Sequence, residues 1–381
     1  MNVLITGGTG TISAGIAQAA VNAGMEVYTY TRGRHSERDV KGAQVFVGDV
    51  WNPEDVKNKL SSKYFDVVVE CLAYDIDHLK MSLKNFEKRC GQYVFISTAG
   101  IYTRNGGRPI KESDPKELKE WDYTREKIEC EAYLKEYCML KKMNYTIIRP
   151  TVTYGDYRIP FPVVSRKNQW TLFQRMKEGR PIVACGNKDI HFSIIHIVDF
   201  SKRVVALFGN KAAFNEDFHI CSRNSVYTWD EVIVCAAKIL GYKADIIHVP
   251  LKIFKSAFDY LYDELKWNKS SDLILDDEKL NRVTGIMETE ITLEEGIRQA
   301  IDNLEEEYQK YNKTLDTYWE RCCDRTLLRA YQKKAISGQE YSILKEYFEK
   351  MSKKDKIFLR IDLLLGTIKT IVNNSVAKLG V

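Results

Sequence analysis

Tyr123 and Lys127 are two side chains whose types and spacing could carry acid–base chemistry. On a helix, residues four apart lie on one face, one turn from each other. A lysine ammonium near a phenol favours the phenolate, so the tyrosine could give or take a proton nearer to neutral pH. This spacing alone is common and usually marks a solvated helix face. It gains weight from residues 93–102, which read as a strand that ends in two hydroxyl side chains, Ser97 and Thr98.

A glycine-rich turn near the start of the chain could hold a phosphate group. An apolar run at residues 3–5 leads directly into Gly7, Gly8 and Gly10, and an apolar-periodic segment follows at 12–23. Glycine lets the backbone come close to a pyrophosphate, and a helix N-terminus supplies free N–H groups and the positive end of a dipole. An ordinary strand–helix turn is the alternative. The order of strand, turn and helix favours a dinucleotide site.

Predicted strands and helices, which could position these residues, alternate along the first 150 residues. Apolar runs predict strands, and the segments between them predict helices. The strands are expected at 26–30, 43–47, 65–71, 93–96 and 145–148, and the helices at 53–60, 78–90 and 125–140. This alternation predicts an α/β fold, a Rossmann-type doubly wound parallel sheet with helices on both faces. Ligands bind beyond the carboxyl ends of such strands, where the glycine turn and Thr98 would lie.

After Pro150 the apolar segments become shorter and irregular, and prolines occur at 160 and 162. This change predicts further domains. We expect a dinucleotide-binding domain at 1–155, to which 191–222 returns, and a smaller substrate domain at 156–303. From 304 to 381 the chain is rich in Lys, Glu and Tyr and contains no Pro, which predicts a helical extension. Within it, the apolar run 357–372 predicts an amphipathic helix. That helix could pack on the enzyme, join two subunits or lie on a membrane surface.

Composition indicates a large enzyme rather than a nucleic-acid or secreted protein. The chain has 381 residues, of which 44% are hydrophobic and 29% charged, and a net charge of +5 that gives no argument for nucleic acid. Its nine cysteines form no CxxC pair, which suggests free thiols, and the histidines lack metal-ligand spacing. We expect no metal, no signal peptide, no transmembrane span and a cytoplasmic location.

The chain resembles the extended short-chain dehydrogenase/reductase family, which includes NAD-dependent epimerases, dehydratases and reductases of nucleotide sugars. The resemblance covers about residues 1–300 and rests on motifs in a fixed order. These are TGGTGTIS at 6–13, GDV at 48–50, the strand end at 97–102, YTREK at 123–127, RPTVTYG at 149–155 and IHIVD at 195–199.

This resemblance implies a catalytic trio of Thr98, Tyr123 and Lys127. Tyr123 would be the general acid or base, and Thr98 would hydrogen-bond the same substrate oxygen. Lys127 would bind the nicotinamide ribose and assist Tyr123, while Asp49 would contact the adenine. The implied cofactor contacts are Gly7, Gly10, Thr11, Ile12, Arg32, Asp49, Val50, Ala73, Ser97 and Lys127.

Two departures from the family pattern concern the cofactor. The third glycine of the turn is Ser13, which is still small enough for close packing of helix on strand. The second expected strand ends in TRGR at 31–34, without the acid that binds the ribose 2′-hydroxyl of NAD. Arg32 could instead pair with a 2′-phosphate, although a solvated loop arginine is the alternative. We therefore expect NAD(P), with NADP favoured over NAD.

Other departures concern the reaction. Ala99 and Gly100 stand where the 4,6-dehydratases of the family carry an Asp-Glu pair, so a dehydratase is disfavoured. Val152 and Phe192 replace an Asn and an Arg of the family pattern, which leaves the identity of the substrate open.

We expect an epimerase or a reductase that transfers hydride at a sugar carbinol or ketone of a nucleotide sugar. Basic residues could bind the diphosphate of that substrate or form a solvated helix face: Arg166, Lys167 and Arg175. We expect the protein to form a homodimer, and we expect no nucleic acid as a partner. The alternative is a non-enzymatic or RNA-associated atypical member of the family that uses the fold as a binding module, as chloroplast RNA-binding proteins and redox-sensing regulators of the family do. Retention of Thr98, Tyr123 and Lys127 together favours an enzyme.

Overall fold

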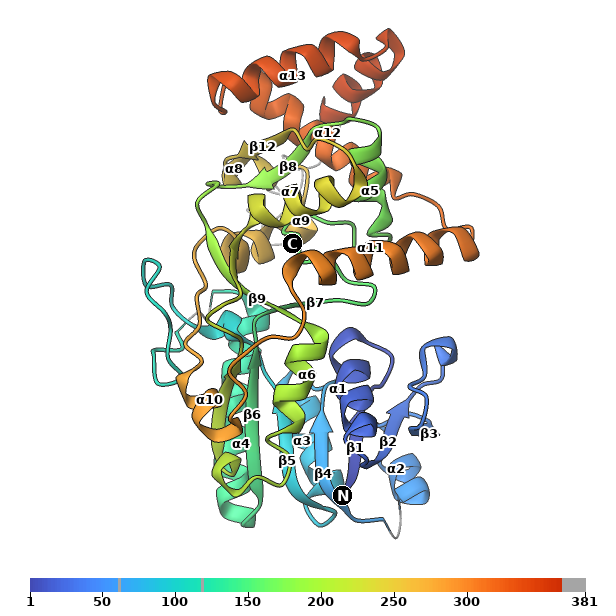
Figure 1. The fold of residues 1–381 in the computed structure, drawn as a ribbon, viewed down its shortest axis with the longest axis vertical. Coiled ribbons are helices and arrows are strands. Elements are labelled where there is room, and N and C mark those ends of the chain that lie inside the picture. The colour runs from blue at the N-terminus through green and yellow to red at the C-terminus, as the bar shows by residue number, and fades with distance from the viewer. Residues whose placement is uncertain (61–62, 118–119, 365–381) are drawn as a thin grey trace, which may run out of the picture. The chain divides into compact units, whose positions relative to one another are not determined.

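The computed structural model describes residues 1–60, 63–117 and 120–364, and its chain folds into two units (Figure 1). Unit 1 comprises residues 1–158, 192–226 and 273–296. Unit 2 comprises residues 159–191 and 227–272 and the chain from 297 onward.

Unit 1 is built on a seven-stranded parallel sheet, which confirms the predicted Rossmann-type fold. The strand order is β10-β6-β5-β4-β1-β2-β3. The strands are β1 Asn2–Thr6, β2 Glu26–Thr31, β3 Gln44–Val47, β4 Phe65–Glu70, β5 Cys90–Ile96, β6 Asn144–Pro150 and β10 Glu216–Ile220. The central strands are rich in Val, Ile and Phe because both of their faces are buried.

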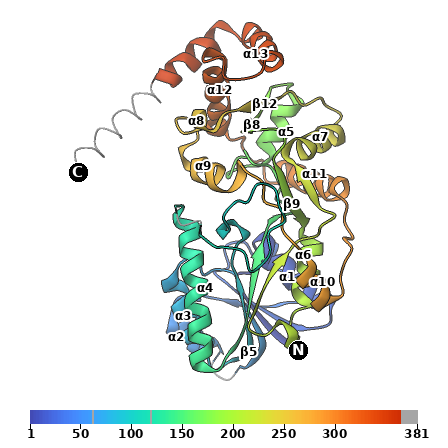
Figure 2. The same ribbon diagram turned by 90° about the vertical axis from the view of Figure 1, so that its left-hand side faces the viewer.

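Helices cover both faces of this sheet (Figure 2). One face carries α1 Thr11–Asn22 and α6 Ile197–Val205, and the other carries α2 Pro53–Leu60, α3 Ile76–Phe86 and α4 Asp122–Lys141. The pleat of β1 assigns its side chains to the two layers: Val3 and Ile5 pack with α1 and α6, whereas Leu4 packs with α2, α3 and α4. A Cβ on Gly15 would lie 2.3 Å from Cγ1 of Ile197, so glycine allows the close approach of α1 and α6.

Shorter strands and helices complete unit 1. A three-stranded sheet has the order β11-β9-β7. Its strands are β7 Val152–Tyr154, β9 His191–His196 and β11 Val226–Thr228, and α10 Glu278–Thr284 follows in unit 1. Short helical turns span Ser36–Arg38, Ala99–Ile101 and Lys211–Ala213.

Unit 2 is mainly helical around one parallel strand pair, β8 and β12. Its elements are α5 Trp170–Lys177, β8 Ile182–Cys185, α7 Trp229–Leu240, β12 Ile246–Val249, α8 Leu251–Phe254, α9 Asp259–Glu264, a π-helical turn at Leu265–Lys269, α12 Thr317–Gln332 and α13 Gly338–Lys350. Helix α11, Leu293–Lys310, begins in unit 1 and ends in unit 2.

The C-terminal region is helical, as predicted, through α12, α13 and residues 353–364. The predicted amphipathic helix at 357–372 lies only partly in this range, because 365–372 fall outside the described residues. In the described part, Leu359 is buried and Asp362 lies 3.5 Å from Nε of Arg325, whereas Phe358 and Leu364 are exposed. No helix in the described part of the chain combines the length and apolar character needed to span a bilayer.

His248 on β12 links two helices of unit 2 and predicts a pH-dependent stability. Its Nε2 lies 2.9 Å from Oδ1 of Asp230 on α7, and its Nδ1 lies 2.9 Å from Oε1 of Glu340 on α13. The hydrogen bond to Asp230, followed by that to Glu340, raises the pKa of His248 above its ordinary value of 6.5, against the opposing effect of burial. The stabilisation is therefore complete below pH 6.5 and is lost as pH rises through the raised value.

We expect His248→Gln to lower the free energy of unfolding by about 1–3 kcal/mol below pH 6, the scale of a charge-assisted hydrogen bond. The difference from the unmutated protein should shrink towards pH 9. Chemical denaturation at a series of pH values measures it, with the exposed His35→Gln as control. A difference that grows with pH would contradict this assignment.

Candidate active site

The glycine turn between β1 and α1 has the conformation that its sequence predicts. Gly7 and Gly8 have φ angles of +91° and +134°. A Cβ on Gly8 would lie 2.8 Å from Cβ of Thr29, so a larger residue does not fit. The hydroxyl of Ser13 accepts from Gly8 N at 3.0 Å and donates to Gly10 O at 3.2 Å. The serine that replaces the third glycine therefore stabilises the turn through two hydrogen bonds to its backbone.

The N-terminus of α1 fits the phosphates of a dinucleotide. The helix begins after Gly10 with no side-chain cap and no acidic residue in its first turn. Its first backbone N–H groups and the positive end of its dipole are therefore available to an anion. Thr11 and Ile12, two predicted cofactor contacts, form this first turn and are half-buried.

The other predicted cofactor contacts of this half of the sheet follow β2 and β3. Arg32 comes directly after β2 and is exposed. Asp49 is also exposed, and its Oδ1 accepts from Trp51 N at 3.1 Å, whereas Val50 is buried. These residues lie beyond the carboxyl ends of their strands, where ligands of this fold bind.

Lys127 is a buried lysine held over the carboxyl ends of β4 and β5. Its Nζ donates to the carbonyl oxygens of Ala73 at 2.7 Å and Ile96 at 3.0 Å. Burial lowers the pKa of Lys127 to about 8. A lysine ammonium has three donors, so one remains for a further acceptor. This arrangement joins two predicted site residues, Lys127 and Ala73, through a direct hydrogen bond.

Tyr123 and Thr98 both precede this lysine in the sequence. Tyr123 is half-buried in the first turn of α4, one turn before Lys127, with its ring centroid 5.0 Å from that of Trp121. Thr98 follows the end of β5, and its Oγ1 accepts from Gly100 N at 3.1 Å. That bond caps the short helical turn that holds Thr98 at the strand end.

A fully buried carboxylate, which the sequence analysis missed, shapes the loop beneath Lys127. Glu70 ends β4, and its Oε1 accepts from Thr6 Oγ1 at 2.7 Å, Leu72 N at 2.7 Å and Ala73 N at 3.1 Å. Its Oε2 accepts from Ser82 Oγ at 2.5 Å. The signal was present, since Glu70 directly follows three apolar residues at the end of the buried strand FDVVVE. Glu70 therefore fixes the turn whose Ala73 carbonyl holds Lys127.

A second buried network centres on Arg149 of β6. Its Nε and Nη2 donate to the two carboxylate oxygens of Glu131 at 2.9 and 2.8 Å, and Nη2 also donates to Asp217. Ser97 Oγ donates to the same Glu131 at 2.7 Å. The Ser97 hydroxyl, predicted to contact the cofactor, is therefore committed to a partner inside the protein.

Unit 2 contains the residues predicted to bind substrate, and one of them is unsuitable. Arg175 is fully buried, and its guanidinium is engaged by Pro181 O, Glu320 and Asp324. Its charge is already paired inside the protein, so the structure gives no support to the prediction that Arg175 binds substrate. Arg166 and Lys167 are exposed, and Arg166 pairs with Glu264 at 2.8 Å.

Comparison with known proteins places the chain in a family. Residues 3–221 match the model of the NAD dependent epimerase/dehydratase family. The chain is 30% identical over 277 residues to the chloroplast stem-loop binding protein of 41 kDa b of Arabidopsis thaliana, covering 68% of this chain and 69% of that protein.

Solved structures share the fold at low sequence identity. An epimerase of Methanothermobacter thermautotrophicus is 15% identical with a TM-score of 0.69, covering 82% of this chain and 94% of that one. UDP-glucose 4-epimerase of Thermotoga maritima, solved with UDP-glucose, is 19% identical with a TM-score of 0.65, covering 82% of this chain and 100% of that one. The family match over more than half of the chain and the matching fold lead to one conclusion: this protein is a member of the NAD-dependent epimerase/dehydratase family.

Proposed function

We propose that the protein is an NAD(P)-dependent epimerase or reductase that transfers hydride at a sugar carbinol or ketone of a nucleotide sugar. The observation that carries this proposal is the buried Lys127, whose ammonium is held by the carbonyls of Ala73 and Ile96 with one donor left over. A structural lysine is seldom buried without a carboxylate partner, since desolvation disfavours its charge. Tyr123, one helical turn away, and Thr98, two residues after Ile96, supply the remaining polar groups.

In this mechanism the chain's residues move one proton and hold the reacting oxygen. Tyr123 takes the proton of the substrate hydroxyl in the oxidative direction and returns it in the reductive one. Thr98 hydrogen-bonds the same oxygen, while the remaining donor of Lys127 binds a ribose hydroxyl and its charge stabilises the phenolate of Tyr123. When bound, NAD(P) supplies the hydride chemistry. Ala99 and Gly100 place no acid beside Thr98 for the elimination of water, so we favour an epimerase or reductase over a dehydratase.

The experiment that tests this function begins with protein purified without added cofactor. Mass spectrometry of the released small molecules should detect NAD(P), and a co-purified nucleotide sugar would name the substrate. UDP- and dTDP-sugars are then incubated with the protein and NAD(P). A changed sugar without net cofactor turnover indicates an epimerase, whereas cofactor oxidation indicates a reductase. Absence of both cofactor binding and sugar turnover would contradict the proposal.

A second candidate is an RNA-associated function, which the similarity to the chloroplast stem-loop binding protein favours. The exposed Arg32 and Arg34 after β2 could contact phosphates. Mobility shift with a stem-loop RNA and with an unstructured RNA of the same length tests this candidate. Retention of Thr98, Tyr123 and Lys127 makes the enzyme our first choice.

The cofactor preference gives a separate prediction. Because the exposed Arg32 stands where an acid would select NAD, we expect NADPH to bind more tightly than NADH. Arg32→Ala should weaken NADPH binding by about 1–3 kcal/mol, the scale of a charge-assisted hydrogen bond, and leave NADH binding nearly unchanged. Isothermal calorimetry measures both, with the exposed Lys41→Ala as control. Tighter binding of NADH than of NADPH by the unmutated protein would refute the preference.

A further inference from the structure

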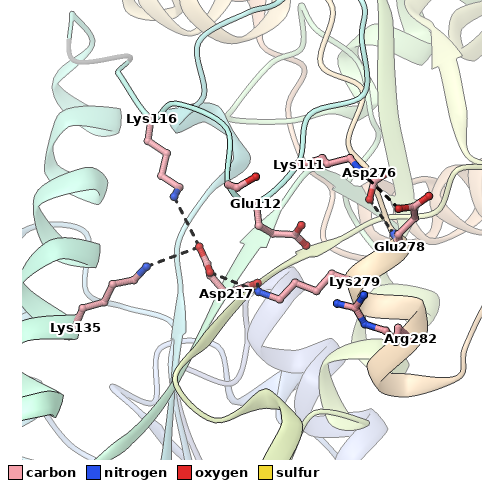
Figure 3. Close-up of a pocket in the computed structure, with 10 residues that line it drawn as sticks. Lys111, Glu112, Lys116, Lys135, Asp217, Asp276, Glu278, Lys279 and Arg282 are labelled. Atoms are coloured by element: carbon pink, nitrogen blue, oxygen red, sulfur yellow. Dashed lines mark hydrogen bonds and ion pairs between the residues drawn. The ribbon is translucent and has the colours of Figure 1, made fainter.

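Unit 1 contains a pocket at the β10 edge of its sheet, distant in strand order from the glycine turn. Its volume is about 390 Å³, and it is lined from the loop after Ile110, from α4, from β10, from Asp276 and from α10 (Figure 3). The lining residues are Lys111, Glu112, Ser113, Lys116, Lys135, Asp217, Asp276, Glu278, Lys279 and Arg282. Neither the proposed catalytic residues nor the predicted cofactor contacts belong to this set.

Three lysines converge on Asp217 in this pocket (Figure 3). The Nζ atoms of Lys116, Lys135 and Lys279 lie 3.8, 3.9 and 3.7 Å from its carboxylate oxygens. These distances exceed the 2.7–3.2 Å of a good N–H···O hydrogen bond. The same carboxylate is also bound directly by Arg149. A single carboxylate is therefore shared by four cations.

Two of these cations, Lys116 and Lys135, have no shorter ion pair among the described residues. Arg149 is neutralised by the bidentate Glu131, and Lys279 donates to Glu216 at 2.6 Å. Lys116 and Lys135 form no ion pair in the described chain except the long ones with Asp217. Their side chains are 25% and 42% exposed, so water screens them only in part. The pocket therefore holds two lysines that share one carboxylate, at N···O distances too long for a good hydrogen bond.

The remaining carboxylates of the pocket have partners other than Lys116 and Lys135. Glu112 accepts from His219 N at 3.1 Å, and burial raises its pKa. Glu278 lies 3.7 Å from Lys111, and Oδ1 of Asp276 accepts from Glu278 N at 3.0 Å. Burial and then Arg149 lower the pKa of Lys116, so this site penalises a further positive charge. An anion in the pocket would relieve that penalty.

We propose that this pocket binds a phosphate group between Lys116 and Lys135, either as inorganic phosphate or as the phosphoryl group of a small molecule. Lysines bind phosphate as point charges, and a phosphate dianion can pair with two lysines that share a single carboxylate. Monohydrogen phosphate also carries one hydroxyl, which can donate to the carboxylate of Asp217. Sulfate has the same charge and shape but no proton, so the neighbouring carboxylate repels it. The site should therefore prefer phosphate to sulfate.

The test is calorimetric titration of the full-length protein at constant ionic strength, with NAD present to occupy the glycine turn. The ligands are inorganic phosphate, sulfate and glycerol 3-phosphate. The variants are Lys116→Gln/Lys135→Gln and, as matched control, Lys84→Gln, an exposed lysine on α3. Thermal unfolding of each variant checks that the fold is retained.

We expect phosphate to saturate one site and sulfate to bind at least about tenfold more weakly, the scale of one charge-assisted hydrogen bond. The double variant should weaken phosphate binding by at least about tenfold for the same reason, and Lys84→Gln should not change it. Tighter binding of glycerol 3-phosphate than of inorganic phosphate would assign the site to a phosphorylated small molecule. No saturable phosphate binding, or equal affinity in the folded double variant, would overturn the proposal.

Discussion

Tyr123→Phe is expected to lower turnover by about 10²–10⁴-fold, the range for a lost general acid or base. The substitution removes one hydroxyl from a half-buried ring at the start of α4 and leaves its packing against Trp121 in place. Fold and cofactor affinity should therefore be unchanged. Steady-state kinetics on the substrate identified above, together with calorimetry of cofactor binding, separates the two effects.

Two further variants make this result specific. Lys127→Met should lower both turnover and cofactor affinity, because the proposal gives its ammonium two roles. Tyr133→Phe removes a hydroxyl from another half-buried tyrosine of α4 and should leave turnover unchanged. Full activity of Tyr123→Phe would show that the catalytic assignment is wrong.

The fold of unit 1 was predictable because its signals are local. Each predicted strand of the large sheet is present, because a short apolar run bounded by turn residues is typical of a strand, even at the exposed edge strand β3. Strand β10 and helix α6 were not predicted as elements, although 191–222 was expected to return to this domain. The other errors are at boundaries. Helix α3 ends at Phe86 rather than at 90, and β5 already begins at Cys90 rather than at 93. The start of α3 was missed by two residues, although the Asp75 side chain, which accepts from His78 N, is a typical N-cap.

The buried polar networks were not predictable, because their partners are far apart in sequence. Arg175 looked like a member of an exposed basic cluster, but its carboxylate partners are Glu320 and Asp324, 145 and 149 residues away. Helical spacing identifies which residues share a helix face, but it cannot identify the distant residues that pack against that face. The same holds for the lysines around Asp217, which come from a loop and two helices.

Arg149→Met gives the largest expected effect on stability. The Arg149 side chain is fully buried. Its guanidinium donates two hydrogen bonds to Glu131 and also binds Asp217 and the hydroxyl of Tyr102. Methionine fills much of the volume but leaves the buried Glu131 carboxylate without a cation. Breaking a buried ion pair from one side costs about 3–5 kcal/mol, which should appear as a lower free energy of unfolding in chemical denaturation.

The matched control for this variant is Arg166→Met, because Arg166 also pairs with a glutamate, Glu264, but its side chain is 58% exposed. An exposed pair contributes about 0–1 kcal/mol, so this variant should change stability little. The double variant Arg149→Met/Glu131→Gln should recover part of the loss, since it no longer buries an unpaired carboxylate. Equal effects of Arg149→Met and Arg166→Met would contradict the assignment. Ser97 donates to the same Glu131. Loss of Arg149 should therefore also perturb the end of β5, where Ser97 directly precedes Thr98.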